Sequence, residues 1–136
     1  MEIVDTVYLV AYLRPSDPLH PDSIEIIEGL GEDRKISQAS LLELDLLMKS
    51  RGFAVDQRVK VWHLLNGVID GSIELLSPLD IALGAFLSSK GLDYFDSLIA
   101  AQCLIRKAEP VTTDPEIIEV IKRGEELLSE FEEFSY

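Results

Sequence analysis

Short apolar segments rich in β-branched residues alternate with helical segments along the chain, and this alternation restricts the fold more than any other feature. The expected strands are 2–6 (EIVDT, ending at Asp5), 34–37 (RKIS), 72–77 (SIELLS) and 109–113 (EPVTT). Strands separated by helices predict a parallel sheet covered on both faces. We therefore expect an α/β fold, a three-layer sandwich with a central parallel sheet of four to five short strands flanked by helices.

Capping and breaking residues delimit the helices between these strands. The expected helical segments are 7–14, 23–30, 38 to about 51, 54–70, 77–91, 93–107 and 114–134. Asp22 or Ser23 is the expected cap of the second helix, because three prolines mark residues 15–22 as a loop. Ser37 and Ser77 stand at similar cap positions, and Pro78 follows at a first helical position. Gly124 divides the last segment into one or two acidic helices.

The composition predicts one domain, residues 1–136, with an acidic helical C-terminal segment from about residue 115. A chain of 136 residues that is 47% hydrophobic has enough apolar material for a core. No apolar run is long enough to span a bilayer, and the N-terminus lacks the basic start of a signal peptide. Cys103 is the only cysteine, which excludes an internal disulfide and a cysteine-based zinc site. We expect a cytoplasmic protein.

Acidic residues outnumber basic ones by 25 to 12, and the net charge is −13. This balance opposes non-specific binding to nucleic acid, which depends on neutralising phosphates. Residues 115–136 alone hold seven Glu and only two basic residues. The remaining chain is still acidic, so its carboxylates either have a role beyond solubility or have no specific role.

The segment LLELDLLM, residues 41–48, places two carboxylates within a strongly apolar helix. At roughly 100° per residue, Glu43 and Asp45 point to opposite sides of that helix. An unpaired carboxylate is costly to bury. We expect Asp45 to face solvent and Glu43 to face a partner that makes its charge tolerable.

Several other acids fall at strand ends or helix starts. Asp5 ends the first strand, Asp114 follows the fourth, and Asp93 and Asp96 open the helix before it. Each of the last three has a simpler explanation, because Asp93 and Asp114 suit helix N-caps and Asp96 suits a helix N-terminal dipole. If the fold gathers these acids, however, they repel one another unless a cation lies between them. Oxygen-only clusters suit Mg²⁺ or Mn²⁺, which can support phosphoryl displacement by water.

The order of these segments resembles the PIN-domain family, metal-dependent ribonucleases common among the toxins of prokaryotic toxin–antitoxin pairs. The resemblance lies in IVDTVYLVAYL (3–13), ISQASLLELDLL (36–47), LSPLDIALGAFLSSKGLDYFDSLIAAQCL (76–104) and VTTD (111–114). ISxxSLLEL together with YFDSLIAA is its most specific part. The resemblance implies a VapC-like toxin, an endoribonuclease dependent on Mg²⁺ or Mn²⁺, with RNA as substrate, a homodimeric state and an antitoxin as partner.

Carried over by position, the family's acidic metal-binding and catalytic quartet corresponds to Asp5, Glu43, Asp96 and Asp114. Asp93 stands beside it as an extra ligand or an N-cap. Supporting positions are Thr6, Ser37 and Thr112. Two departures are visible: Val7 replaces a frequent Ser or Asn, and the segment after Asp114 is acidic and helical where the family has a final short strand.

Arg14, Lys49 and Arg51 are candidate phosphate contacts, or ordinary surface residues. Trp62 is expected in the core or an interface, and His63 at the surface. No arrangement of Ser, His and Asp suggests nucleophilic catalysis.

Two other functions remain open. One is a weakly active or inactive PIN-fold interaction module, favoured by the negative charge and opposed by the presence of all four acids. The other is a receiver-type phospho-acceptor domain, which would need paired acids after the first strand, an Asp after the third and a Lys after the last. Here those positions read as a single Asp5, LLSP and TTD.

Overall fold

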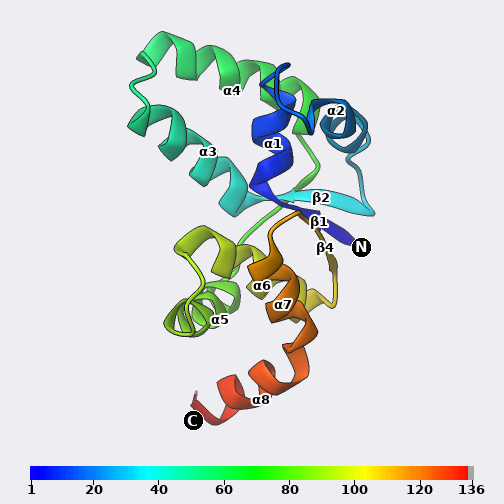
Figure 1. The fold of residues 1–136 in the computed structure, drawn as a ribbon, viewed down its shortest axis with the longest axis vertical. Coiled ribbons are helices and arrows are strands. Elements are labelled where there is room, and N and C mark those ends of the chain that lie inside the picture. Colours follow the sequence, from blue (N-terminus) through cyan, green and yellow to red (C-terminus); the bar gives the residue numbers. More distant parts are fainter. Residues whose placement is uncertain (135–136) are drawn as a thin grey trace.

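The computed structural model describes residues 1–134 and contains one parallel sheet with helices on both faces (Figure 1). The strands are β1 (Glu2–Val4), β2 (Arg34–Ser37), β3 (Ile73–Glu74) and β4 (Glu109–Val111). Their order in the sheet is β3-β2-β1-β4, and all neighbours are parallel. The predicted three-layer α/β sandwich is therefore confirmed, with four strands.

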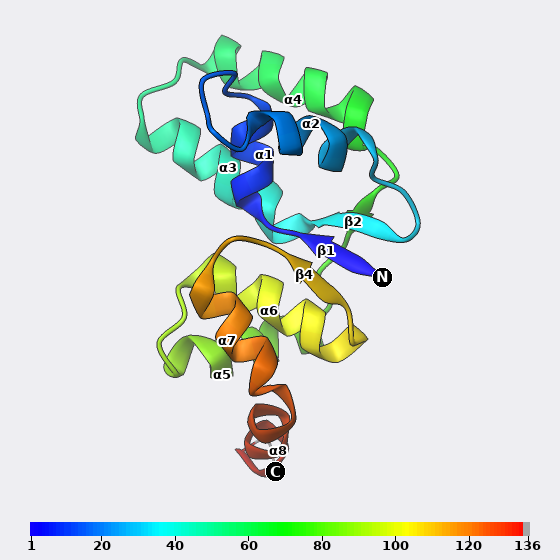
Figure 2. The same ribbon diagram turned by 45° about the vertical axis from the view of Figure 1, so that its right-hand side comes forward.

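Helices connect every pair of successive strands. They are α1 (Thr6–Tyr12), α2 (His20–Glu28), α3 (Gln38–Ser50), α4 (Val55–Ile69), α5 (Pro78–Ser89), α6 (Tyr94–Arg106), α7 (Pro115–Lys122) and α8 (Gly124–Phe134). Figure 2 shows α1 to α4 on one side of the sheet and α5 to α7 on the other, with α8 beyond them. No helix within residues 1–134 combines the length and apolar character needed to cross a membrane.

Successive residues of β1 explain why both faces of the sheet are covered. Ile3 and Val4 are both fully buried, and they point to opposite faces because side chains alternate along a strand. Val4 packs with Leu9 and Leu44 in the core beneath α1 to α4. Ile3 packs with Ile99 in the core beneath α6. One short strand thus joins the two layers of helices.

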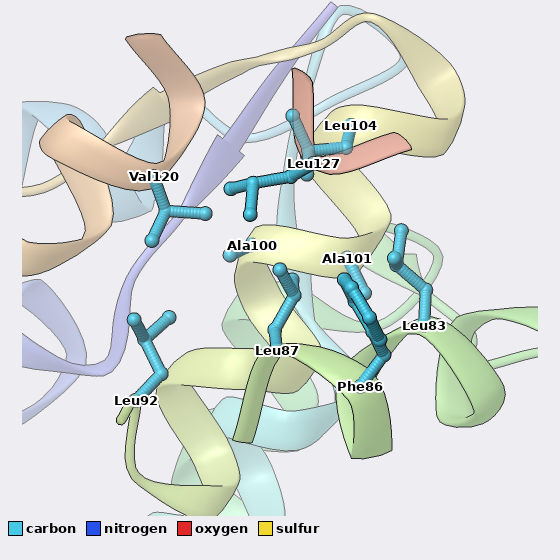
Figure 3. Close-up of a cluster of buried hydrophobic side chains, with 9 residues drawn as sticks. All are labelled: Leu83, Phe86, Leu87, Leu92, Ala100, Ala101, Leu104, Val120 and Leu127. Atoms are coloured by element: carbon cyan, nitrogen blue, oxygen red, sulfur yellow. The ribbon is translucent and has the colours of Figure 1, made fainter. Parts of the chain in front are cut away.

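A third apolar cluster lies farther from the sheet, among α5, α6, α7 and α8 (Figure 3). Its members are Leu83, Phe86, Leu87, Leu92, Ala100, Ala101, Leu104, Val120 and Leu127. Gly124 lets α8 approach α6 closely, since a Cβ at this position would lie 2.7 Å from a methyl carbon of Leu104. The acidic C-terminal segment is therefore packed on the molecule through its apolar face.

The second helix begins earlier than expected. We predicted a cap at Asp22 or Ser23, but α2 begins at His20 and includes Pro21 in its first turn. Proline is tolerated there because the first helical N–H groups have no partner within the helix. The hydroxyl of Ser23 instead donates to the carbonyl of His20 at 2.7 Å. The caps predicted at Ser37, Ser77 and Asp93 are all present.

The order of the strands reverses at one point in the sheet. From β1 the chain moves outward through β2 and β3, and β4 then returns to the other side of β1. The order therefore reverses between β1 and β4, where the backbone N–H of Asp5 donates to the carbonyl of Val111 at 3.0 Å. Ligand sites of open parallel sheets form at such reversals, beyond the carboxyl ends of the strands.

Candidate metal centre

Asp5 lies at the carboxyl end of β1 and is also the N-cap of α1. Its Oδ1 accepts a hydrogen bond from the backbone N–H of Thr6 at 2.6 Å, and its Oδ2 accepts one from the hydroxyl of Thr112 at 2.7 Å. Only 5% of the residue is exposed. Because both oxygens are held, the orientation of the carboxylate is determined by the ends of β1 and β4 together.

Asp114 follows β4 and is the N-cap of α7, where its Oδ1 accepts from the backbone N–H of Glu116 at 2.8 Å. Its own backbone N–H donates to the hydroxyl oxygen of Thr112 at 2.9 Å. Thr112 therefore joins Asp114 to Asp5 through one hydroxyl. The cap role that we considered for Asp114 is real, and it leaves the second carboxylate oxygen out of the cap.

Glu43 lies on the second turn of α3 and is partly buried. Burial raises the pKa of Glu43 above its ordinary value, and the negative charges of Asp5, Asp93 and Asp114 raise it further. A hydrogen bond from Thr6 acts in the opposite direction. The apolar helix thus brings a carboxylate to the acidic end of β1 without supplying a cation.

Asp96 lies in the first turn of α6, which Asp93 caps by accepting from the backbone N–H of Asp96 at 2.9 Å. Burial and the charge of Asp93 raise the pKa of Asp96 to about 8, and proximity to Asp114 and Asp5 contributes. The raised pKa of Asp96 therefore reflects the concentration of negative charge at the site.

Three of the predicted acids converge closely. One carboxylate oxygen from each of Asp5, Glu43 and Asp96 lies within 4.8 Å of the others. We call these three residues the acid trio. Asp114 and Asp93 are outside this closest set, but their charges raise the pKa of its members. Among residues 1–134, no ion pair joins any of these five acids to a basic side chain.

The donor set fits a hard divalent cation. The trio offers only carboxylate oxygens, which suit Mg²⁺ and Mn²⁺ better than softer transition metals. Burial combined with like charge raises the pKa of all three carboxyls. A divalent cation would remove that repulsion, whereas no charged group of the described chain does so.

The predicted supporting residues occupy two different positions. The hydroxyls of Thr6 and Ser40 form a hydrogen bond at 2.9 Å, which links α1 to α3 beside the trio. Ser37 donates its hydroxyl to the side-chain carbonyl of Gln102 at 2.6 Å and accepts from the backbone N–H of Ala39 at 3.1 Å. Neither hydrogen bond of Ser37 reaches a carboxylate.

Ser40 and Gln102 were missed in the sequence analysis, although each has a sequence signal. Ser40 lies one helical turn before Glu43 and therefore on the same side of α3. Gln102 is the one amide in the apolar run SLIAAQCL of α6. A long polar side chain at such a position is expected to find a buried partner.

The side chain of Asp45 is 37% exposed, in line with the expected orientation toward solvent, but it also has partners that we did not predict. Its two oxygens accept hydrogen bonds from Arg58 at 3.2 and 2.6 Å, and one of them also accepts from the indole N–H of Trp62 at 2.9 Å. These hydrogen bonds, from Arg58 first and then Trp62, lower the pKa of Asp45. Asp45 therefore ties α3 to α4, and Trp62 packs at the edge of the core beneath them.

The candidate phosphate contacts are exposed, as is His63. Arg14 and Arg51 line a pocket of about 190 Å³ between α1, α3 and α4, whose other lining residues are apolar. None of the acid trio lines this pocket. The suggested roles of Arg14, Lys49 and Arg51 in holding phosphate therefore stay predictions.

The chain is similar to known proteins in its sequence profile and in its fold. The profile of the PIN domain matches residues 3–123. No curated protein matches the chain significantly. Among solved structures, FitAcB from Neisseria gonorrhoeae is 19% identical with a TM-score of 0.65, covering 90% of this chain and 94% of that one.

Two further structures share the fold. VapBC2 from Rickettsia felis, bound to a DNA fragment from its promoter, is 20% identical with a TM-score of 0.60, covering 90% of this chain and 91% of that one. FitAB bound to an IR36 DNA fragment is 18% identical with a TM-score of 0.65, covering 92% and 91% respectively. At these identities the structures establish a common fold.

Proposed function

This chain belongs to the PIN-domain family, whose members are generally nucleases, and from that premise we propose that it is a metal-dependent endoribonuclease. The acid trio is the observation that carries the proposal. Three carboxylates from β1, α3 and α6 meet at the strand-order reversal, and no basic side chain within residues 1–134 forms an ion pair with them.

Asp5, Glu43 and Asp96 would hold a Mg²⁺ or Mn²⁺ ion, with Asp114 at its edge. When bound, such an ion can activate water and stabilise the charged oxygens of a phosphodiester. Asp93 serves as the cap of α6 and adds negative charge to the site.

The residues around the trio orient these ligands. Thr112 and the backbone N–H of Thr6 each hold one oxygen of Asp5, so this carboxylate cannot rotate freely. Outer hydrogen bonds of this kind tune metal ligands and affect affinity. The same hydroxyl of Thr112 fixes the backbone of Asp114, which keeps the fourth acid close to the trio.

RNA is the substrate that we propose, following the family resemblance. The net charge of −13 weakens general attraction to a polyanion. A divalent cation at the trio would give the surface a local positive centre, which favours binding of a phosphate at that point. Substrate binding would therefore depend on the cation as strongly as catalysis does.

We also propose that the protein acts as the toxin of a toxin–antitoxin pair and forms a homodimer. The support is the resemblance of the sequence to such toxins and the shared fold with chains of the VapBC2 and FitAB complexes. An antitoxin could use the pocket between α1, α3 and α4, which offers apolar walls and the guanidinium groups of Arg14 and Arg51. Co-expression with the product of an adjacent reading frame, followed by co-purification, tests this assignment.

Cleavage of single-stranded RNA tests the nuclease proposal. We expect cleavage with Mg²⁺ or Mn²⁺, loss of cleavage with EDTA, and loss in Asp5→Asn and Asp96→Asn. Asp56→Asn makes the same chemical change at an exposed position of α4 and should retain full activity. Cleavage that survives EDTA, or both site substitutions, would contradict the mechanism.

An inactive PIN-fold interaction module is the second candidate, and the strongly negative charge is the observation that favours it. Both candidates predict binding of a divalent cation, but only the nuclease predicts product. If the wild-type protein binds Mn²⁺ and cuts no RNA over a range of lengths and sequences, the interaction module becomes the better description.

A further inference from the structure

We propose that Gln102 is a positioning residue that holds α3 against α6 so that Glu43 and Asp96 meet. The proposal rests on the proposed function, because it concerns the acid trio. The proposal also goes beyond that function, because it assigns a role to a side-chain amide that forms no hydrogen bond with any of the three acids. Gln102 lies in the middle of α6 and is fully buried.

The amide of Gln102 makes three hydrogen bonds to two strands. Its oxygen accepts from the hydroxyl of Ser37 at 2.6 Å. Its nitrogen donates to the backbone carbonyls of Glu74 at 3.1 Å and Leu75 at 3.3 Å. One side chain of α6 therefore binds the carboxyl ends of both β2 and β3, and the orientation of its amide is set because donor and acceptor ends face different partners.

The link to the acid trio runs through the two helices. Ser37 is the N-cap of α3 and accepts from the backbone N–H of Ala39, so its hydroxyl connects Gln102 to the first turn of that helix. Glu43 is six residues beyond Ser37 on α3, and Asp96 is six residues before Gln102 on α6. At 1.5 Å per residue, the backbone of Glu43 lies roughly 9 Å along α3 from Ser37, and that of Asp96 roughly 9 Å along α6 from Gln102. A shift of either helix at the Ser37–Gln102 hydrogen bond would therefore separate Glu43 from Asp96.

Packing alone does not require an amide at this position. A leucine would fill a similar volume in an apolar run, but it would leave the hydroxyl of Ser37 and two strand carbonyls without this partner. Burying an amide is unfavourable unless its hydrogen bonds are made. The polar side chain therefore specifies one alignment of α3, α6 and the strand ends, whereas an apolar contact would tolerate several.

Binding of Mn²⁺ to the purified full chain tests this proposal. Gln102→Leu removes all three side-chain hydrogen bonds. Ser37→Ala removes the hydrogen bond between Gln102 and α3, together with the cap of that helix, and leaves the hydrogen bonds to Glu74 and Leu75. We expect both variants to bind Mn²⁺ about tenfold or more weakly in calorimetry, because a site binds well only when its ligands are held within about 0.5 Å of the productive geometry. Ser77→Ala is the matched control. Ser77 is the N-cap of α5, as Ser37 is of α3, but its hydroxyl forms no hydrogen bond with Gln102.

An Mn²⁺ dissociation constant unchanged in folded Gln102→Leu and Ser37→Ala would overturn the proposal. So would an equal loss in Ser77→Ala, because the effect would then reflect general destabilisation. If Gln102→Leu does not fold, Ser37→Ala decides the question alone, since it keeps the Gln102 amide and its bonds to Glu74 and Leu75.

A metal-free measurement separates this proposal from the proposed function. Spin labels at Leu46→Cys on α3 and Tyr94→Cys on α6, both exposed positions, report the distance between the helices in a Cys103→Ser background. We expect a broader or shifted distance distribution in Gln102→Leu and Ser37→Ala, and an unchanged one in Ser77→Ala. Wild-type protein that binds no Mn²⁺ would contradict the metal proposal, and identical distributions in all variants would contradict the role of Gln102.

Discussion

The hydroxyl of Thr112 donates a 2.7 Å hydrogen bond to the carboxylate of Asp5, and these residues are 107 positions apart in the chain. The parallel pairing of β1 with β4 makes this contact, because it aligns Val4 with Val111 and so brings the residues after both strands together. The same hydroxyl accepts from the backbone N–H of Asp114. One threonine therefore joins the first and last acids of the predicted quartet.

Thr112→Val should impair the site while leaving the fold intact. The substitution removes the hydrogen bond that orients Asp5, and we expect Mn²⁺ to bind about 10 to 100 times more weakly, with a parallel fall in RNA cleavage. Loss of two partly buried hydrogen bonds should also lower the free energy of unfolding by about 1–3 kcal/mol. Calorimetry and urea unfolding measure these effects. Thr113→Val, at the exposed neighbouring position, should change neither, and equal effects of the two substitutions would disprove the specific role of Thr112.

Removing one acid of the trio should stabilise the protein when no metal is present. Burial and neighbouring negative charges raise the pKa of Asp96 from 3.8 to about 8. At neutral pH folding must therefore protonate a carboxyl that is ionised in the unfolded chain, and an uncharged Asn avoids this cost. We expect Asp96→Asn to melt several degrees higher than wild type in EDTA. Excess Mn²⁺ should raise the melting temperature of wild type, because a ligand that binds only the folded state stabilises it, and should have little effect on Asp96→Asn. If wild type melts at a higher temperature than Asp96→Asn in EDTA, the proposal that the acids repel one another is contradicted.

The ion pair of Asp80 and Arg106 predicts a loss of stability in acid. Burial by itself raises the pKa of Asp80, but hydrogen bonds from Arg106 and from the backbone N–H of Ser77 outweigh it, and the pKa is lowered overall. A carboxyl with a lowered pKa stabilises the folded state above its unfolded pKa near 3.8 and loses that contribution as the pH falls through the folded pKa. Wild-type stability should therefore decrease steeply below about pH 4.

Asp80→Asn tests this acid dependence. Breaking the buried ion pair with Asp80 leaves Arg106 only the longer 3.5 Å contact with Glu74, so we expect a loss of roughly 3 kcal/mol near neutral pH. The difference between wild type and variant should narrow between pH 4 and pH 2 in urea unfolding. A difference that stays constant over this range would show that Asp80 is not ionised in the folded protein.

The contact between Asp45 and Arg58 should matter for stability and not for catalysis. The pair joins α3 to α4, away from the acid trio, and Asp45 also accepts from Trp62. We expect Asp45→Ala to lower the urea midpoint while the cleavage rate of the folded fraction stays at the wild-type level. Glu43→Ala, two positions away on the opposite side of the same helix, should abolish cleavage. Equal loss of activity in both variants would contradict this division of roles.

The last helix should contribute to stability although it lies beyond the residues that match the family profile. Leu127 of α8 is 1% exposed within the cluster of α5, α6 and α7, and the rings of Phe86 and Phe131 lie 5.6 Å apart. We expect Leu127→Ala to destabilise the protein by about 3 kcal/mol. Leu128→Ala, at a less buried neighbouring position, should cost less, and the reverse order would contradict the packing of α8.

Much of the secondary structure followed from local signals. Ser37, Ser77 and Asp93 were recognisable as caps because each precedes a helix that would otherwise begin with unsatisfied N–H groups. The predicted start of α2 was wrong because Pro21 suits either a loop or a first helical turn, and the local sequence does not distinguish these two possibilities. The short β3, only Ile73–Glu74, is likewise limited by pairing to β2 and not by its own residues.

The partners of polar side chains were not predictable. Asp45 was expected to face solvent and is partly exposed, but Arg58 and Trp62 of the next helix also donate hydrogen bonds to it. Ser37 was recognised as a cap, while its hydrogen bond to Gln102 depends on a helix 65 positions away. These contacts depend on how helices pack across the sheet.

The sequence by itself determined the alternation of strands and helices, the caps of α3, α5 and α6, and the presence of acids after β1 and β4, because each depends on neighbours a few residues apart. Only the tertiary structure decided which oxygens meet. Asp5, Glu43 and Asp96 come from a strand end and two separate helices, and their separation depends on strand pairing and on hydrogen bonds across the sheet. The physical reason is that the period of a helix or strand sets the direction of a side chain, whereas the long-range packing of whole elements sets its distance from another.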